Sequence, residues 1–110
     1  TQYLSSATNA DNVTFKAALK KANPAVAPSL ASANVYSATQ IAVRAAQQGG
    51  AAELLTTIPT TKISTPGGPL AFDGRHNTSM TVYVAKMGAG FVPTVEYTQE
   101  SVAPRTGCDK

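Results

Sequence analysis

The fold of this chain depends most on residues 65–73, which read Thr65-Pro66-Gly67-Gly68-Pro69-Leu70-Ala71-Phe72-Asp73. Prolines and glycines so close together predict a rigid turn, because proline fixes φ and glycine adopts backbone angles that other residues avoid. The residues after Pro69 predict a very short strand over 70–73. The stretch therefore predicts a crossing between the part of the chain before it and the part after it.

Helices are expected before the crossing. Apolar residues recur at helical spacing over 10–22, after the capping residues Thr8 and Asn9, and Asn23-Pro24 ends that segment. A second, Ala-rich helix is expected over 31–48, with Gly49-Gly50 as its stop. Its expected contact face consists of small residues, which allow close packing: Ala38, Ala42, Ala45 and Ala46. A short third helix is expected over 51–57, closed by Pro59.

Strands are expected after the crossing. Residues 80–87 alternate in the manner of a strand, and Gly88-Ala89-Gly90 predicts a turn. A second strand is expected over 91–97, where Pro93 indicates an edge or a bulge. The rest of the chain, from Thr98 onward, shows little periodicity and is expected to be a tail.

The composition describes a foldable chain with few large core side chains. Its 110 residues allow at most one domain, and they hold 21 Leu, Ile, Val and Phe against 19 Ala. Helices so rich in alanine cannot cover themselves, and a lone hairpin is marginal in water. The elements resemble one face of an α/β layer whose sheet is largely missing. Both a small Ala-rich domain and a piece of a larger protein fit this composition.

Several classes of protein and site are excluded or disfavoured. No apolar run approaches the length of a membrane span. The basic residues are spread along the chain without interleaved aromatics, which argues against a nucleic-acid partner despite a net charge of +3. One His and one distant Cys give no metal site, and no cofactor motif is present. Cys108 is either an exposed thiol or the partner of a cysteine outside this chain.

A catalytic device is not expected, although Asp73, Arg75, His76 and Ser79 lie close together in sequence. A Ser-His-Asp device needs residues that converge from rigid elements, and a Gly-rich turn is more often simply solvated. Tyr36 is the largest side chain of the Ala-rich helix. It either fills a gap in a core of methyl groups or presents its ring or hydroxyl to a small ligand.

The succession of these segments is similar to a known one. Its parts are residues 34–40, Ala45–Gly49, Leu54-Leu55, the crossing with His76-Asn77, and Val82–Val84. The chain resembles the C-terminal part of type I periplasmic solute-binding proteins of ABC transporters, in the group for branched-chain amino acids, urea and short-chain amides. Ser5–Asn9 before Phe15 resembles the urea and short-chain-amide branch in particular. The resemblance covers nearly all of residues 1–97, and the crossing is its most specific part.

The resemblance implies a two-lobed α/β protein that closes on a small polar solute by hinge motion, without catalysis. The chain would hold helices of one lobe over residues 1–69, the crossing and terminal strands over 70–97, and a tail over 98–110. The implied partners are the solute, a membrane permease and the remainder of the parent chain, in the periplasm. Some amino-acid-binding members use an aromatic at the position of Tyr36, which makes it the implied ligand-binding residue.

Three other functions stay open on the sequence alone. The first is an amide-sensing regulatory protein of the same fold, and the second is a free-standing α/β interaction domain. The third is a hydrolase that uses His76. The sequence names neither the solute nor the oligomeric state, because most residues that contact the solute would lie outside these 110.

Overall fold

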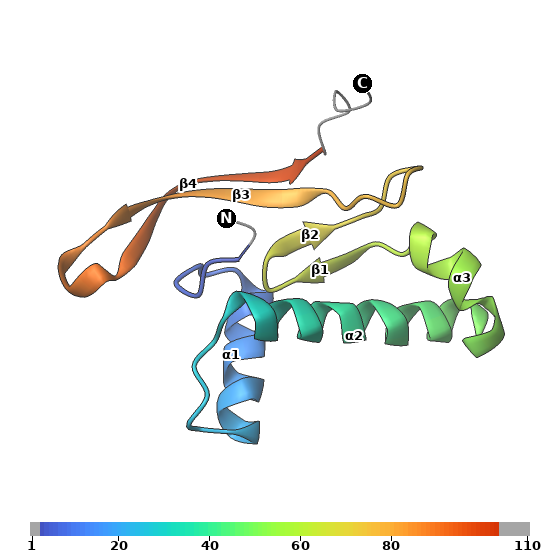
Figure 1. Cartoon of the computed structure of the whole chain (residues 1–110), viewed down its shortest axis with the longest axis horizontal. Coiled ribbons are helices and arrows are strands. Elements are labelled where there is room, and N and C mark those ends of the chain that lie inside the picture. The colour runs from blue at the N-terminus through green and yellow to red at the C-terminus, as the bar shows by residue number, and fades with distance from the viewer. Residues whose placement is uncertain (1–2, 104–110) are drawn as a thin grey trace.

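The computed structural model describes residues 3–103, and Figure 1 shows how they are arranged. Helix α1 (Ala10–Ala22) lies across the beginning of α2 (Leu30–Gly49), and two antiparallel hairpins follow in sequence. The first hairpin lies alongside α2, and the second extends beyond it. Both long helices thus precede the crossing and the second hairpin follows it, as the sequence predicts. Cys108 lies outside the described residues, so neither alternative for its thiol is tested.

Helix α2 is bounded by the capping residues that its sequence provides. The Ser29 hydroxyl accepts a hydrogen bond from the Ser32 backbone N–H (3.2 Å), and Ser32 Oγ accepts one from the Ser29 N–H (3.0 Å). These two bonds satisfy donors that have no partner within the helix. Gly50 ends the helix at φ 78°, in the left-handed region that favours glycine.

The packed face of α2 differs from the predicted one. The buried residues lie four apart in the sequence: Ala33, Ser37, Ile41 and Ala45. Of the predicted face, Ala38 and Ala42 are exposed, whereas Ala45 is buried. The buried face of α2 is the one that contains Ile41. Burying a large aliphatic side chain removes more apolar surface from water than burying another alanine.

The segment after α2 is more irregular than one short helix. It consists of a 3-10 turn (Ala51–Glu53), the single-turn helix α3 (Leu54–Thr57) and a second 3-10 turn (Ile58–Thr60). Pro59 lies inside the second 3-10 turn and does not close the segment. The first turn of a helix tolerates proline, since no backbone N–H is needed there.

The Pro-Gly stretch forms the loop of a short hairpin. Strands β1 (Ile63–Thr65) and β2 (Gly68–Leu70) pair antiparallel, with Thr65 opposite Gly68. The strand expected over 70–73 is therefore displaced toward the N-terminus. Beyond β2, Phe72 pairs with Thr78 in an isolated bridge. Strand β1 was not predicted, because its three residues carry no periodicity and depend on β2 for their pairing.

The second hairpin is longer than predicted. Strand β3 (Met80–Met87) has the predicted bounds, and β4 (Pro93–Val102) begins at the proline and pairs with it antiparallel through two irregularities in register. Residues 98–102 belong to β4, so the prediction of a tail from Thr98 is wrong for them. All but Val102 are polar and exposed, and their strand conformation comes from backbone pairing with β3.

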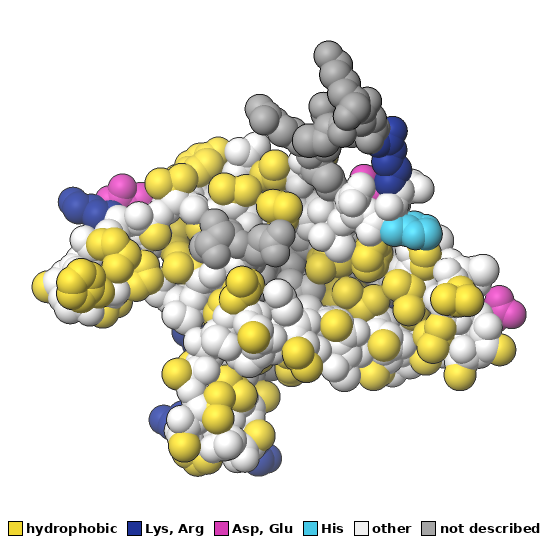
Figure 2. All heavy atoms as spheres, in the orientation of Figure 1, with side chains coloured by type: hydrophobic (Ala, Val, Ile, Leu, Met, Phe, Trp, Pro, Cys, Tyr) yellow, Lys and Arg dark blue, Asp and Glu magenta, His cyan; other side chains and the backbone are white. Residues whose placement is uncertain are grey.

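The apolar core is small. It is formed by Tyr3, Phe15 and Ala33, with Leu19 and Tyr36 packed against it. The Tyr3 and Phe15 rings meet edge to face, with centroids 6.0 Å apart. Many large apolar side chains stay exposed, among them Val35, Val43, Leu55 and Phe91. Figure 2 shows apolar side chains scattered over the visible face, in keeping with the thin core expected from the composition.

A buried asparagine supports this core. Asn12 is fully buried, and its side-chain nitrogen donates to the carbonyls of Ala7 (2.8 Å), Ser5 (3.2 Å) and Leu4 (3.4 Å). Its side-chain oxygen accepts from the Tyr3 hydroxyl (3.1 Å). The Asn12 side chain thus holds the N-terminal segment against α1. A buried amide whose nitrogen and oxygen both form hydrogen bonds takes the place of apolar side chains here.

Replacement of Asn12 is therefore expected to destabilise the protein. Asn12→Ala leaves buried carbonyls without a donor and should lower the free energy of unfolding by on the order of 3 kcal/mol. The higher helix propensity of alanine offsets only about 0.5 kcal/mol of this loss. Urea denaturation measures the change. Asn34→Ala, at an exposed position on α2, is the control and should have little effect. Equal effects of the two variants would contradict this role of Asn12.

Candidate functional site

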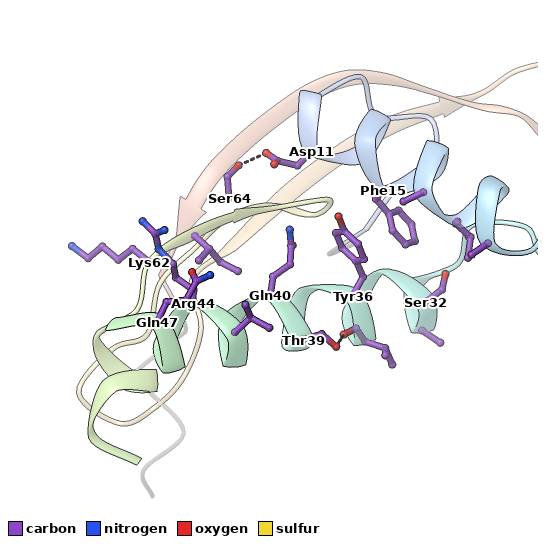
Figure 3. Close-up of a pocket in the computed structure, with 17 residues that line it drawn as sticks. Asp11, Phe15, Ser32, Tyr36, Thr39, Gln40, Arg44, Gln47, Lys62 and Ser64 are labelled. Atoms are coloured by element: carbon purple, nitrogen blue, oxygen red, sulfur yellow. Dashed lines mark hydrogen bonds between the residues drawn. The ribbon is translucent and has the colours of Figure 1, made fainter. Parts of the chain in front are cut away.

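A groove of about 1150 Å³ runs between α1, α2 and β1. Figure 3 shows its lining, in which side chains from α1 and α2 face the β1–β2 hairpin. The floor is largely apolar, with Phe15 and Leu19 from α1 and Val35, Tyr36 and Val43 from α2. A concave apolar surface with a few polar groups at its edge can accept either a ligand or another part of a protein.

Tyr36 lies on this floor. Its ring centroid is 5.1 Å from that of Phe15, and the two rings are tilted by 52°. The residue is half-buried, so its ring both packs on the core and lines the groove. The position fits both roles that the sequence leaves open for Tyr36, the gap-filling side chain and the ligand-binding one.

Polar side chains form the edge of the groove. The Ser64 hydroxyl donates to the Asp11 carboxylate, which links β1 to α1 across one end (Figure 3). Gln40 points from α2 into the groove. Its buried side-chain oxygen has no hydrogen-bond partner among the described residues. Arg44 and Lys62 add positive charge toward the other end.

Most of this edge was not predicted from the sequence, although part of it carried a signal. Tyr36, Gln40 and Arg44 are four residues apart, which places them on one face of a helix. Asp11 and Ser64 are 53 positions apart, and nothing local in the sequence indicates that they meet.

The polar residues near His76 build a turn. Asp73 Oδ1 accepts from the backbone N–H groups of Arg75 and Asn77, both at 2.8 Å. Ser79 Oγ accepts from the backbone N–H of Ala71 (3.2 Å). His76 has φ 64°, a left-handed conformation that fits a tight turn. The described residues show no hydrogen bond from the His76 ring to Asp73 or Ser79, and the bonds that they do show are those of a turn.

The described part of the chain also contains no group of three or more His, Cys, Asp or Glu residues placed to hold a metal ion. Within the same residues, no helix combines the length and the hydropathy needed to cross a membrane.

The Asp73 carboxylate is expected to hold this turn more strongly in its charged form. Hydrogen bonds from the backbone, first that of Asn77 and then that of Arg75, lower its pKa below the ordinary 3.8. The stabilisation is thus present above the unfolded-state pKa and is lost as the pH falls through the lowered folded value. An NMR titration should show the Arg75 and Asn77 amide signals shifting together at a pH below 3.8.

Two variants of Asp73 check this account. Asp73→Ala should speed hydrogen exchange at both amides, whereas Asp73→Asn keeps an acceptor oxygen and should preserve much of the protection without the low-pH transition. Unchanged exchange in Asp73→Ala would contradict the role of the carboxylate.

Comparison with known proteins gives a consistent result. Residues 1–91 match a family described as periplasmic binding protein. The fold is similar to that of an ABC-transporter solute-binding protein from R. palustris, solved in complex with benzoate. The TM-score is 0.79 at 20% identity, over 99% of this chain and 32% of that one. These matches confirm the predicted fold class, a partial type I periplasmic-binding-protein fold.

A second structure, from Rhodopseudomonas palustris BisB5, is an ABC-transporter solute-binding protein in complex with 3,4-dihydroxybenzoic acid. It has a TM-score of 0.76 at 20% identity, over 93% of this chain and 30% of that one. The chain thus spans about a third of the length of these two structures. No curated protein matches its sequence.

Proposed function

The chain belongs to the periplasmic binding protein family, and from this premise we propose that it is the C-terminal part of a receptor that hands a small solute to an ABC-transporter permease. The observation that carries the proposal is the family match over residues 1–91. The receptor binds its solute without catalysis, outside the cytoplasm. The solute favours the closed arrangement of two lobes by the extra contacts that it makes there.

We propose that the groove between α1 and α2 receives the remainder of the receptor. Its floor is apolar, Val35 and Val43 of that floor are exposed, and the exposed Leu30 extends the apolar surface at the start of α2. Contiguous apolar surface of this kind marks a contact with another protein surface. The two similar structures are about three times as long as this chain. A receptor of that length would contain further protein that could cover the groove.

The solute belongs to one of two chemical classes. The resemblance to the amide and amino-acid group favours urea, a short amide or an amino acid. The two similar structures hold benzoate and 3,4-dihydroxybenzoic acid, which favours an aromatic carboxylate. Both classes consist of small polar molecules. Measuring which of them binds to the intact receptor distinguishes the two classes.

A thermal-shift panel on the intact receptor tests the function. A solute present at a hundred times its Kd should stabilise the folded protein by about 2.7 kcal/mol and raise Tm accordingly. The panel holds urea, acetamide, leucine, benzoate and 3,4-dihydroxybenzoate, with acetate as a control for nonspecific anion effects. A receptor whose Tm responds to no member of the panel would contradict the proposed solutes.

Tyr36 remains the candidate ligand-binding residue, at a position where the solute would lie between the groove and the remainder of the receptor, and two variants test it. If its ring contacts the solute, Tyr36→Ala should weaken binding about tenfold, which corresponds to about 1.4 kcal/mol. Tyr36→Phe shows whether the hydroxyl takes part. Calorimetry gives Kd, and Tyr97→Ala on β4 is the control. A lower Tm with unchanged Kd in Tyr36→Ala would assign the ring to the core alone, beside Phe15.

A further inference from the structure

Helix α1 has two sides of different chemistry. The side that lines the groove carries Asp11, Phe15, Ala18, Leu19 and Ala22. Its three lysines, Lys16, Lys20 and Lys21, are about 100–140° away from Phe15 around the helix axis, because successive residues turn by about 100°. We call these three residues the lysine face. A protein segment seated in the groove contacts the opposite side of α1 and leaves the lysine face accessible.

The excess positive charge of the described residues lies on α1. The helix carries the three lysines and a single acidic residue, Asp11 in its first turn. The Asp11 carboxylate accepts a hydrogen bond from the Ser64 hydroxyl, at the end of the helix away from Lys20 and Lys21. Elsewhere in the described residues the charges balance, with four basic side chains (Arg44, Lys62, Arg75, Lys86) and four acidic ones (Glu53, Asp73, Glu96, Glu100).

The end of α1 that carries this charge projects from the molecule. Figure 1 shows it extending away from α2 and from both hairpins, and Figure 2 shows dark blue side chains at its margins. Every residue from 20 to 27 is exposed. Lys16 Nζ donates to the Ser5 carbonyl (3.0 Å), and the apolar Val13, 53% exposed, lies one turn before it. A projecting, basic end of this kind can contact a flat, negatively charged surface.

The residue type favours a lipid surface over a protein surface. Arginine is enriched and lysine depleted where two proteins meet, since a guanidinium binds a carboxylate through two parallel hydrogen bonds. A lysine ammonium is a hydrated point charge, which anionic headgroups attract without a fixed geometry. The arginines of the described residues, Arg44 and Arg75, lie on other segments of the chain.

We propose that the lysine face binds the anionic headgroups of the bilayer that holds the permease. The proposal goes beyond the proposed function and rests on it only for the presence of that bilayer. One lysine near an anionic surface strengthens partitioning about fivefold, so three give a preference of about a hundredfold over a neutral bilayer. A contact of this strength is reversible, and it raises the concentration of the receptor beside the permease.

Sedimentation of the intact receptor with lipid vesicles, without solute, tests the proposal. We expect binding to vesicles that contain phosphatidylglycerol and little binding to phosphatidylcholine alone. Binding should be lost in about 1 M salt, where the screening length falls to about 3 Å. Equal binding to the two kinds of vesicle, or binding only to vesicles that also contain the permease, overturns the proposal. Since no solute is added, a wrong solute assignment leaves this test intact.

Variants that change the same charge at two places locate the contact. Lys20→Gln should weaken binding to phosphatidylglycerol vesicles about fivefold. Lys86→Gln, at an exposed position on β3, is the matched control and should have little effect. Lys20→Arg keeps the charge and should keep the binding. Equal losses in the two glutamine variants would assign the attraction to net charge and overturn the proposal, as would full binding by Lys20→Gln.

The vesicle measurement also separates this role from a structural one. Lys20 and Lys21 lie in the last turn of α1, where positive charge stabilises the helix through its dipole. Loss of that effect lowers Tm slightly but leaves the preference for anionic vesicles unchanged. A Lys20→Gln variant that changes only Tm therefore contradicts the proposal.

Discussion

The turn at Thr65–Gly68 is the constraint on which the rest of the structure depends. The Thr65 carbonyl accepts a hydrogen bond from the Asn9 side chain at the start of α1 (3.3 Å). On its other side, the Gly67 carbonyl accepts from the Tyr83 hydroxyl of β3 (3.4 Å). One rigid turn therefore contacts both the helical part and the terminal hairpin. Within this turn the glycine at position 68 allows close approach, because a Cβ there would collide with the side chain of Thr81 on β3.

The sequence predicted what local chemistry determines. Helix α1 has the bounds that its periodicity and Asn23-Pro24 indicate, and α2 ends at the predicted glycine pair. The errors occur where structure depends on distant partners. Strand β1 exists because β2 pairs with it, and residues 98–102 are extended because β3 supplies their hydrogen bonds. No local pattern predicts either.

The residues of the candidate site also separate into those that a local pattern indicates and those that depend on contacts distant in the sequence. Tyr36 was singled out because it is the largest side chain of the Ala-rich helix, and it does line the groove. Gln40 was missed, although its spacing from Tyr36 indicates the same helix face. The close approach of Gly68 to the Thr81 side chain could not be predicted, because it depends on how the first hairpin packs against β3. The shortage of large core side chains explains why a buried polar residue such as Asn12 contributes so much to this fold.

The contacts between α1 and the first hairpin also constrain the order of folding. Asn9 reaches Thr65 across 56 positions, and Asp11 reaches Ser64 across 53. Closing a loop of this length costs chain entropy before the contact returns any energy, whereas the helices and the β3–β4 hairpin close over short distances. We therefore expect the local elements to form first and the α1–β1 contacts to form late. Until then the apolar sides of both helices are exposed, and a newly made chain is most prone to misassociate in this interval.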